Sequence, residues 1–221
     1  MELNDKQLEA LIREELKIRS DNLSDYELRR LHFLRIHGPI RDLSGIESAS
    51  ELNRLYIDST LLSDISSLSH LSKLTTLQIF QTKVSDLYPI SELSNLKELI
   101  LSEDQLTDIY PLRKLKGLTK LNLYRNRITE IDALSSLINL EQLDIGDNLL
   151  TNIDPVCHLS NLEYLDIDGN KVEDVGILRE LKNLRKVNLG GNPLNPDSIA
   201  NHIPYLEGSG VQVINNSQNK R

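Results

Sequence analysis

The stretch LTKLNLYRNRITEIDALSSLINL, residues 118–140, begins and ends on leucines that belong to one evenly spaced series. Neighbouring members of this series lie 22 residues apart, at Leu52, Leu74, Leu96, Leu118, Leu140, Leu162 and Leu184, and Leu31 precedes the first of them by 21. A constant period of this length indicates an array of structural repeats, each of which packs mainly against its two neighbours.

Each repeat contains the pattern of a short strand. Counted from the leading leucine, positions 4 and 6 are apolar in all eight repeats, as in Leu121 and Leu123, and one variable residue separates them. Such alternation buries one face of a strand. Stacked strands of this kind predict a right-handed leucine-rich repeat solenoid of the α/β class, with eight parallel strands on its concave face.

The second part of each repeat has the pattern of a tight turn. Position 9 carries small polar residues, namely Thr60, Thr82, Asp104, Asn126, Asn148, Asn170 and Asn192. Stacked asparagines can both donate and accept hydrogen bonds, so we expect them to bridge successive repeats. Proline recurs at position 16, as Pro89, Pro111 and Pro155. Because few residues remain before the next strand, short 3₁₀ turns are expected on the convex side.

The two ends of the array differ from the repeats and predict caps, which a solenoid needs to cover its terminal core. Residues 1–30 form the expected N-terminal helical cap, with apolar residues at helical spacing in 5–18 and a capping box at Ser24 and Glu27. The repeats span 31–194 and a C-terminal cap spans 195–214. Residues 215–221 are expected to be a flexible polar tail.

Within the C-terminal cap, Asn195-Pro196 favours the start of a helix and Ile203-Pro204 favours its end. Val211 and Val213 are placed to add a last edge strand.

The repeats LKELILSEDQLTDIYPLRKLKGL (96–118) and 118–140 resemble the 22-residue repeats of bacterial internalins. The same repeat class occurs in a regulatory leucine-rich repeat subunit of protein phosphatase 1. Both ends of the chain also resemble known proteins. The N-terminal segment, residues 8–31 followed by 40–55, is similar to the helical cap of internalin-like proteins. The C-terminal segment, residues 192–213, is similar to the end of a bacterial repeat array. The resemblance implies a protein-binding scaffold, with a host surface protein as one class of partner and an intracellular enzyme as another.

Composition narrows the function classes. The chain of 221 residues has a formal charge of −8, which disfavours binding to nucleic-acid phosphates. Cys157 is the one cysteine, so the fold needs no disulfide. The charged N-terminus lacks the apolar core of a signal peptide, and no run of residues is long and apolar enough to span a membrane. These features predict a monomer that is cytoplasmic by default, or secreted or located at the cell surface if a leader has been removed.

Positions 3, 5 and 7 of each repeat should point outward on the concave sheet, and five of the nine aromatic residues fall there. Exposed aromatic clusters are typical of interaction surfaces, although aromatic residues also suit strands. We therefore predict a binding stripe of Tyr56, Phe80, Ile100 and Tyr124, with Arg54, Lys120 and Arg125 as charged neighbours.

The later repeats add Tyr164 and two acidic residues to the candidate face. Asp144 and Asp166 occupy position 5 of successive repeats, so they should lie side by side at an electrostatic cost. Either a basic partner relieves this repulsion, or Lys120 and Lys186 reach over the pair; a tolerated, solvated acidic patch is an equal alternative.

The sequence contains no pattern typical of catalysis, of cofactor binding or of metal coordination. Residues 166–170 begin like a calcium loop, but the twelfth position from Asp166 is Ile177 instead of glutamate. The five histidines lack zinc-like spacing, and there is no phosphate-binding loop. We therefore predict a non-enzymatic protein-interaction module without cofactor or metal. The alternatives are a regulatory subunit of an enzyme such as a phosphatase and a structural spacer.

Overall fold

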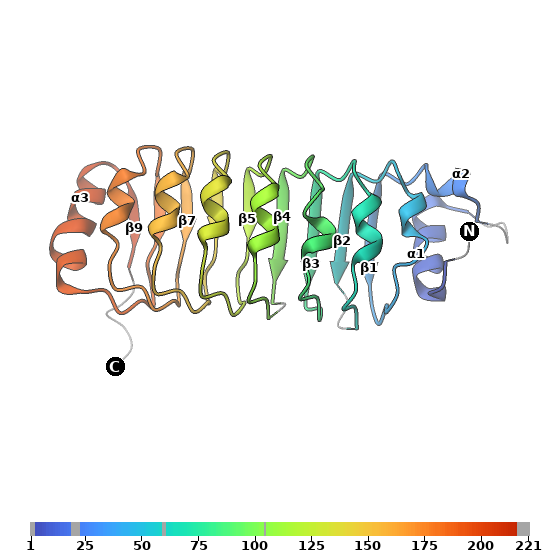
Figure 1. Ribbon diagram of the computed structural model, residues 1–221, viewed down its shortest axis with the longest axis horizontal. Coiled ribbons are helices and arrows are strands. Elements are labelled where there is room, and N and C mark those ends of the chain that lie inside the picture. Colours follow the sequence, from blue (N-terminus) through green and yellow to red (C-terminus); the bar gives the residue numbers. More distant parts are fainter. Residues whose placement is uncertain (1–2, 19–22, 59–60, 104, 216–221) are drawn as a thin grey trace.

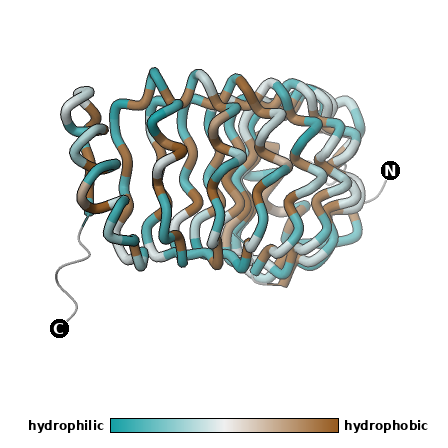
Figure 2. The backbone as a smooth tube through the Cα atoms, turned by 60° about the vertical axis from the view of Figure 1, so that its left-hand side comes forward, coloured by the Kyte–Doolittle hydropathy of each residue, from teal (hydrophilic) through white to brown (hydrophobic). Residues whose placement is uncertain are grey.

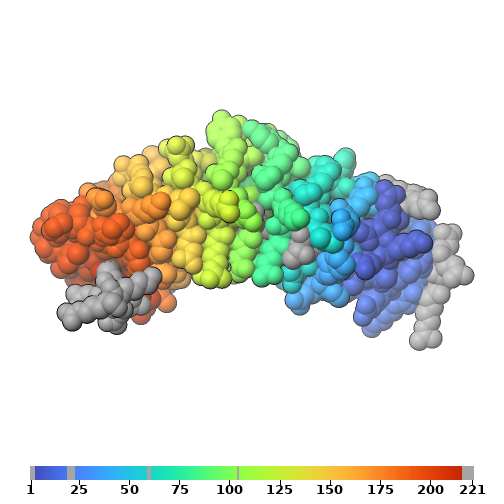
Figure 3. Space-filling view, turned by 90° about the horizontal axis from the view of Figure 1, so that it is seen from below, coloured from blue at the N-terminus to red at the C-terminus, as the bar shows by residue number. Residues whose placement is uncertain are grey.

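A computed structural model describes residues 3–18, 23–58, 61–103 and 105–215 of the chain. The repeats stack into one elongated arch, with the N-terminal segment at one end and the C-terminal segment at the other (Figure 1, Figure 3). One layer of the arch is a β-sheet and the other is a row of 3₁₀ turns (Figure 1). This is the leucine-rich repeat architecture that the 22-residue period predicts.

All strands of the sheet are parallel and follow the order of the sequence. They are β1 (Phe33–His37), β2 (Arg54–Asp58), β3 (Thr76–Phe80), β4 (Glu98–Ser102), β5 (Lys120–Asn122), β6 (Gln142–Asp144), β7 (Tyr164–Asp166), β8 (Lys186–Asn188) and β9 (Gln212–Ile214). Residues at equal repeat positions pair across neighbouring strands, as Leu55 does with Leu77. The eight expected repeat strands are confirmed, and β9, just after Val211, extends the sheet to nine.

The core lies between the strands and the turns. The position 4 and position 6 side chains, such as Leu121 and Leu123, are fully buried, and hydrophobic residues recur at matching places in successive turns of the chain (Figure 2). The opposite wall comes from 3₁₀ turns η1 (Ile46–Ser48), η2 (Ser66–His70), η3 (Tyr88–Ile90), η4 (Tyr110–Lys114), η5 (Asp132–Ser136), η6 (Asp154–His158) and η7 (Gly176–Glu180). Proline is the second residue of η3, η4 and η6, within the first turn where its spacing places it.

The asparagines at position 9 form the expected bridge between repeats. The side-chain amide of Asn148 donates to the carbonyl of Leu123 in the preceding repeat at 3.0 Å and to two carbonyls of its own repeat. Its oxygen accepts from the backbone NH of Ile128, also at 3.0 Å. Asn126, Asn170 and Asn192 repeat this pattern. Thr60 and Asp104 lie outside the described residues.

The N-terminal cap contains two helices. In α1 (Lys6–Leu16) the side chain of Asp5 accepts from the first backbone NH groups, and Leu8 and Ile12 are buried against the first repeat. Before α2 (Asp25–Leu28), Ser24 and Glu27 form the predicted capping box. Both helices therefore cover the apolar end of the solenoid.

The C-terminal cap contradicts one prediction. A helical turn at Ser198–His202, wider than an α-helical turn, leads directly into α3 (Ile203–Gly208), so the helix does not end at Ile203-Pro204. Pro204 instead sits in the first turn of α3, where its missing NH removes no hydrogen bond that the α-helix needs. Of the expected flexible tail, 215–221, all residues but Asn215 lie outside the described residues.

Candidate functional site

The parallel register brings the predicted binding residues onto one side of the sheet. Two of these residues are exposed, Arg54 and Arg125. The others are half-buried, namely Tyr56, Phe80, Ile100, Lys120, Tyr124, Asp144, Tyr164 and Asp166. The side chains at positions 4 and 6 of each strand point into the core and hold the fold together. The opposite, outer face of the sheet carries the variable side chains of the repeat.

An aromatic hollow occupies the N-terminal part of the face. The rings of Phe33 and Tyr56 meet edge to face with centroids 5.3 Å apart, and the guanidinium carbon of Arg54 lies 5.5 Å from the Phe33 centroid. Tyr56 and Phe80 also line a depression of about 300 Å³, together with Arg35, Asp58 and Gln78 among others. This volume is at the lower end of the range for small-molecule pockets and suits one or two inserted side chains.

Ile100 and Lys120 continue the face on β4 and β5. Ile100 lies between Gln78 and Asn122 in the register of the sheet. The ammonium of Lys120 is 3.0 Å from a carboxylate oxygen of Glu98, its neighbour on β4. Because this pair is partly exposed, it contributes little to stability.

Tyr124 is held in one orientation by the next repeat. A Cβ atom on Gly146 would lie 3.2 Å from the edge of the Tyr124 ring, so the absence of a side chain there leaves room for the phenol to lie over the backbone. The hydroxyl bonds to Asp147, and this hydrogen bond raises the pKa of Tyr124 above its ordinary value. A ring fixed in this way loses little entropy when a partner binds.

A row of polar residues at position 8 borders the face, and of its members Arg125 alone was identified from the sequence. Gln81 donates to Glu103 at 3.1 Å, and Arg125 lies 4.0 Å from Glu103 and 3.5 Å from Asp147. All four residues have positive φ, as do the glycines that follow them at the same position, Gly169 and Gly191. The residues of this row share a left-handed backbone conformation but not a side-chain type. The sequence therefore shows no repeated residue at position 8 that would predict the row.

The acidic pair lies where the repeat spacing predicts. Asp144 and Asp166 are direct partners on β6 and β7, and burial, followed by the charge of Asp166, raises the pKa of Asp144. The amide of Asn122 donates to Asp144 at 2.8 Å, and that of Asn188 to Asp166 at 3.1 Å. Tyr164 donates to Asp166 at 2.9 Å, and burial and this bond raise the pKa of Tyr164.

The suggested lysine bridge over this pair is wrong. Lys120 pairs with Glu98, and the ammonium of Lys186 lies 5.6 Å from the centroid of the Tyr164 ring. Among the described residues, no cationic side chain forms an ion pair with Asp144 or Asp166. The amides of Asn122 and Asn188 and the phenol of Tyr164 donate hydrogen bonds to the two carboxylates. These bonds stabilise the carboxylates but do not neutralise their negative charge.

Within the described part of the chain, no group of three histidine, cysteine or acidic side chains is suited to hold a metal ion. None of the described helices has the length and apolar character needed to cross a membrane.

Comparison with known proteins identifies the repeats. A family model for leucine-rich repeats in two copies matches residues 94–136 and 116–158, and a second leucine-rich repeat model matches 138–194. A search of curated protein sequences gave no match.

Solved structures with the same fold include two internalins of Listeria monocytogenes. Internalin C2 is 27% identical, with a TM-score of 0.86 over 96% of this chain and 94% of that one. A second internalin, InlF, is 22% identical, with a TM-score of 0.54 over 98% of this chain and 90% of that one, and shows likeness of fold alone.

Proposed function

Because this chain is an internalin-like leucine-rich repeat protein, a class that serves in protein interaction, we propose that it binds a protein partner on the concave face of its sheet. The observation that carries the proposal is the aromatic stripe. Tyr56 and Phe80 open a hollow toward solvent, and the repeat that follows Tyr124 fixes its ring. Rigid aromatic side chains on a preformed surface supply most of the energy in many interfaces.

The face divides into two regions that suit different parts of one partner. Apolar side chains of the partner would enter the hollow between Tyr56 and Phe80 and cover Ile100. A lysine or arginine of the partner would lie against Asp144 and Asp166, whose charges no described side chain neutralises. The proposed partner is therefore a protein surface with an apolar patch beside a basic one.

The proposed role is non-enzymatic, because leucine-rich repeat proteins of this kind serve in protein interaction and the hollow at Tyr56 and Phe80 is a depression in an open sheet face. The likeness to bacterial internalins favours a host surface protein as the partner. An intracellular enzyme, such as a phosphatase held by a regulatory subunit, is the alternative that the repeat class implies.

The test is affinity capture with a matched pair of variants. The stripe variant is Tyr56→Ser, Phe80→Ser, Tyr124→Ser, and the control is Tyr26→Ser, Tyr205→Ser, which changes exposed tyrosines at the two ends of the molecule. Circular dichroism verifies that both variants fold. The proposal expects a protein from cell-surface extracts or lysates that wild type and control retain and the stripe variant loses. Equal retention by all three would place binding elsewhere, and the absence of any specific partner would favour a structural spacer.

A further inference from the structure

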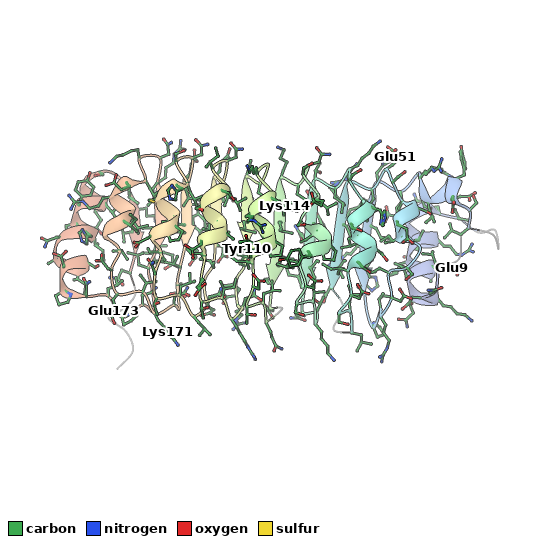
Figure 4. The ribbon with its side chains drawn as sticks, viewed as in Figure 1. Glu9, Glu51, Tyr110, Lys114, Lys171 and Glu173 are labelled. Carbon is green, nitrogen blue, oxygen red and sulfur yellow. The ribbon has the colours of Figure 1, made fainter. Side chains whose placement is uncertain are left out.

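The most exposed tyrosines of the repeats lie on the convex side of the arch. Tyr88 is 57% exposed and Tyr110 is 52% exposed, and both occupy position 15, the first residue of a 3₁₀ turn. Figure 4 shows Tyr110 and Lys114 on the turn side, away from the sheet. The guanidinium carbon of Arg113 lies 3.5 Å from the centroid of the Tyr110 ring, and its Nη1 donates to the Tyr110 carbonyl at 3.1 Å. The ring therefore stands in a fixed orientation.

A hollow of about 280 Å³ opens beside Tyr110, between the fourth and fifth repeats. Ala133 and Tyr110 supply apolar lining, and three acidic residues, Asp108, Glu130 and Asp132, also line it. Ile109 borders the hollow, but its side chain is buried in the core. The sequence explains why the hollow forms here. Position 16 holds proline in the third, fourth and sixth repeats but Ala133 in the fifth, and position 15 changes from tyrosine to Asp132. A smaller residue and a shorter side chain leave this space unfilled.

The three carboxyl groups carry an unbalanced charge. Within the described parts of the chain, none of Asp108, Glu130 and Asp132 forms an ion pair. Two cationic side chains of the neighbouring turn are engaged elsewhere, since Lys114 pairs with Glu92 and Arg113 stacks on Tyr110. The Tyr110 NH donates a hydrogen bond to Asp108 at 2.8 Å.

We propose that this hollow is a second docking site, which takes the arginine or lysine side chain of a basic protein segment. The aliphatic stem would lie on Ala133 and the Tyr110 ring, and the cationic head would lie among the carboxylates. The volume fits one side chain and is below the range typical of small-molecule pockets. Tyr88, one repeat away on the same side, would contact the flanking residues of that segment. This site is independent of the concave face.

The test uses a tetra-arginine peptide with blocked termini, titrated into the isotope-labelled full chain and followed by nuclear magnetic resonance. A tetra-glutamate peptide is the charge control. Three variants separate a built site from general attraction to an acidic protein. Ala133→Pro fills the hollow with the residue that three other repeats carry there, and Asp132→Asn removes one charge. Asp154→Asn is the matched control, because Asp154 holds the same position in the next repeat but precedes Pro155.

The site predicts saturable shifts centred on residues 107–110 and 129–133, and dissociation constants raised about fivefold or more by Ala133→Pro and by Asp132→Asn. Asp154→Asn and the concave stripe variant should bind as wild type does. Equal effects of Asp132→Asn and Asp154→Asn, or full binding by a folded Ala133→Pro variant, would overturn the proposal. Shifts confined to the strands of Asp144 and Asp166 would also overturn it and would place the basic segment on the concave face.

Discussion

Asp144 and Asp166 occupy equal positions in successive repeats, so the parallel register sets their carboxylates directly across neighbouring strands. The fold favours the neutral form of Asp144, because burial and the second carboxylate raise its pKa. Ionised Asp144 therefore opposes folding at neutral pH. A residue that lowers stability and still faces solvent is consistent with selection for binding.

We predict that Asp144→Asn stabilises the free protein at pH 7 by about 0.5 kcal/mol, since it removes one of two like charges on opposed positions. The sign follows from the raised pKa. Wild type loses the penalty when Asp144 is protonated, so the gain should shrink as the pH falls through the raised pKa and vanish below the ordinary aspartate range. Urea unfolding at pH 7 and at low pH measures this difference. A destabilised variant at pH 7 would show that the acidic pair does not oppose folding.

At the scale of the repeat, the asparagine ladder and the 3₁₀ turns could be predicted because each depends on one residue type at one position. The left-handed residues at position 8 could not, since Gln81, Arg125, Asp147 and Gly169 share only their backbone conformation. The placement of the Tyr124 ring over Gly146 was also missed, because it depends on the direction in which a side chain leans toward the next repeat. The prediction that a helix ends at Ile203-Pro204 was wrong because an isolated proline is compatible with either end of a helix. Here the wider turn at Ser198–His202 precedes Pro204, so the proline lies in the first turn of α3.

The asparagine ladder predicts a large effect for a single change. Asn148→Ala removes three donated hydrogen bonds and one accepted bond, and it leaves the buried NH of Ile128 without its partner. We expect a loss of about 2–3 kcal/mol in the free energy of unfolding.

The matched control is Asn139→Ala. This exposed asparagine donates one hydrogen bond to the carbonyl of Lys116, and its loss should cost about 0.5 kcal/mol or less. Urea denaturation measures the free energy of unfolding of both variants. Equal losses of this free energy in Asn148→Ala and Asn139→Ala would mean that the ladder does not hold the repeats together.

For the whole molecule, stability in a linear array is a sum of repeat terms and interface terms, so it can differ along the axis. The second half of the solenoid holds the ladder of Asn126, Asn148, Asn170 and Asn192, whereas the third repeat has Thr82 at that position. The Thr82 hydroxyl accepts from the Val84 NH at 3.2 Å. Because a hydroxyl has one hydrogen to donate and an amide has two, we expect the third repeat to be less tightly bridged to its neighbours than the repeats that carry asparagine.

This difference predicts uneven hydrogen exchange along the axis. The backbone amides of β6 and β7 should exchange more slowly than those of β2 and β3, because opening the second half breaks the ladder bonds as well as the sheet. Exchange read by mass spectrometry on peptides from each repeat measures the gradient. Uniform protection from β2 to β7 would indicate that the array opens as one unit.

Binding of a protein partner on the concave face can be tested by site-specific photo-crosslinking. A photoreactive residue at Gln78 would lie beside the aromatic hollow, and one at Glu180, exposed at the end of η7, would sample the convex side. We predict that the captured partner is crosslinked from position 78, but not from position 180, and that the stripe variant abolishes the crosslink. Crosslinking from position 180 alone, or equal crosslinking from both positions in the stripe variant, would contradict it.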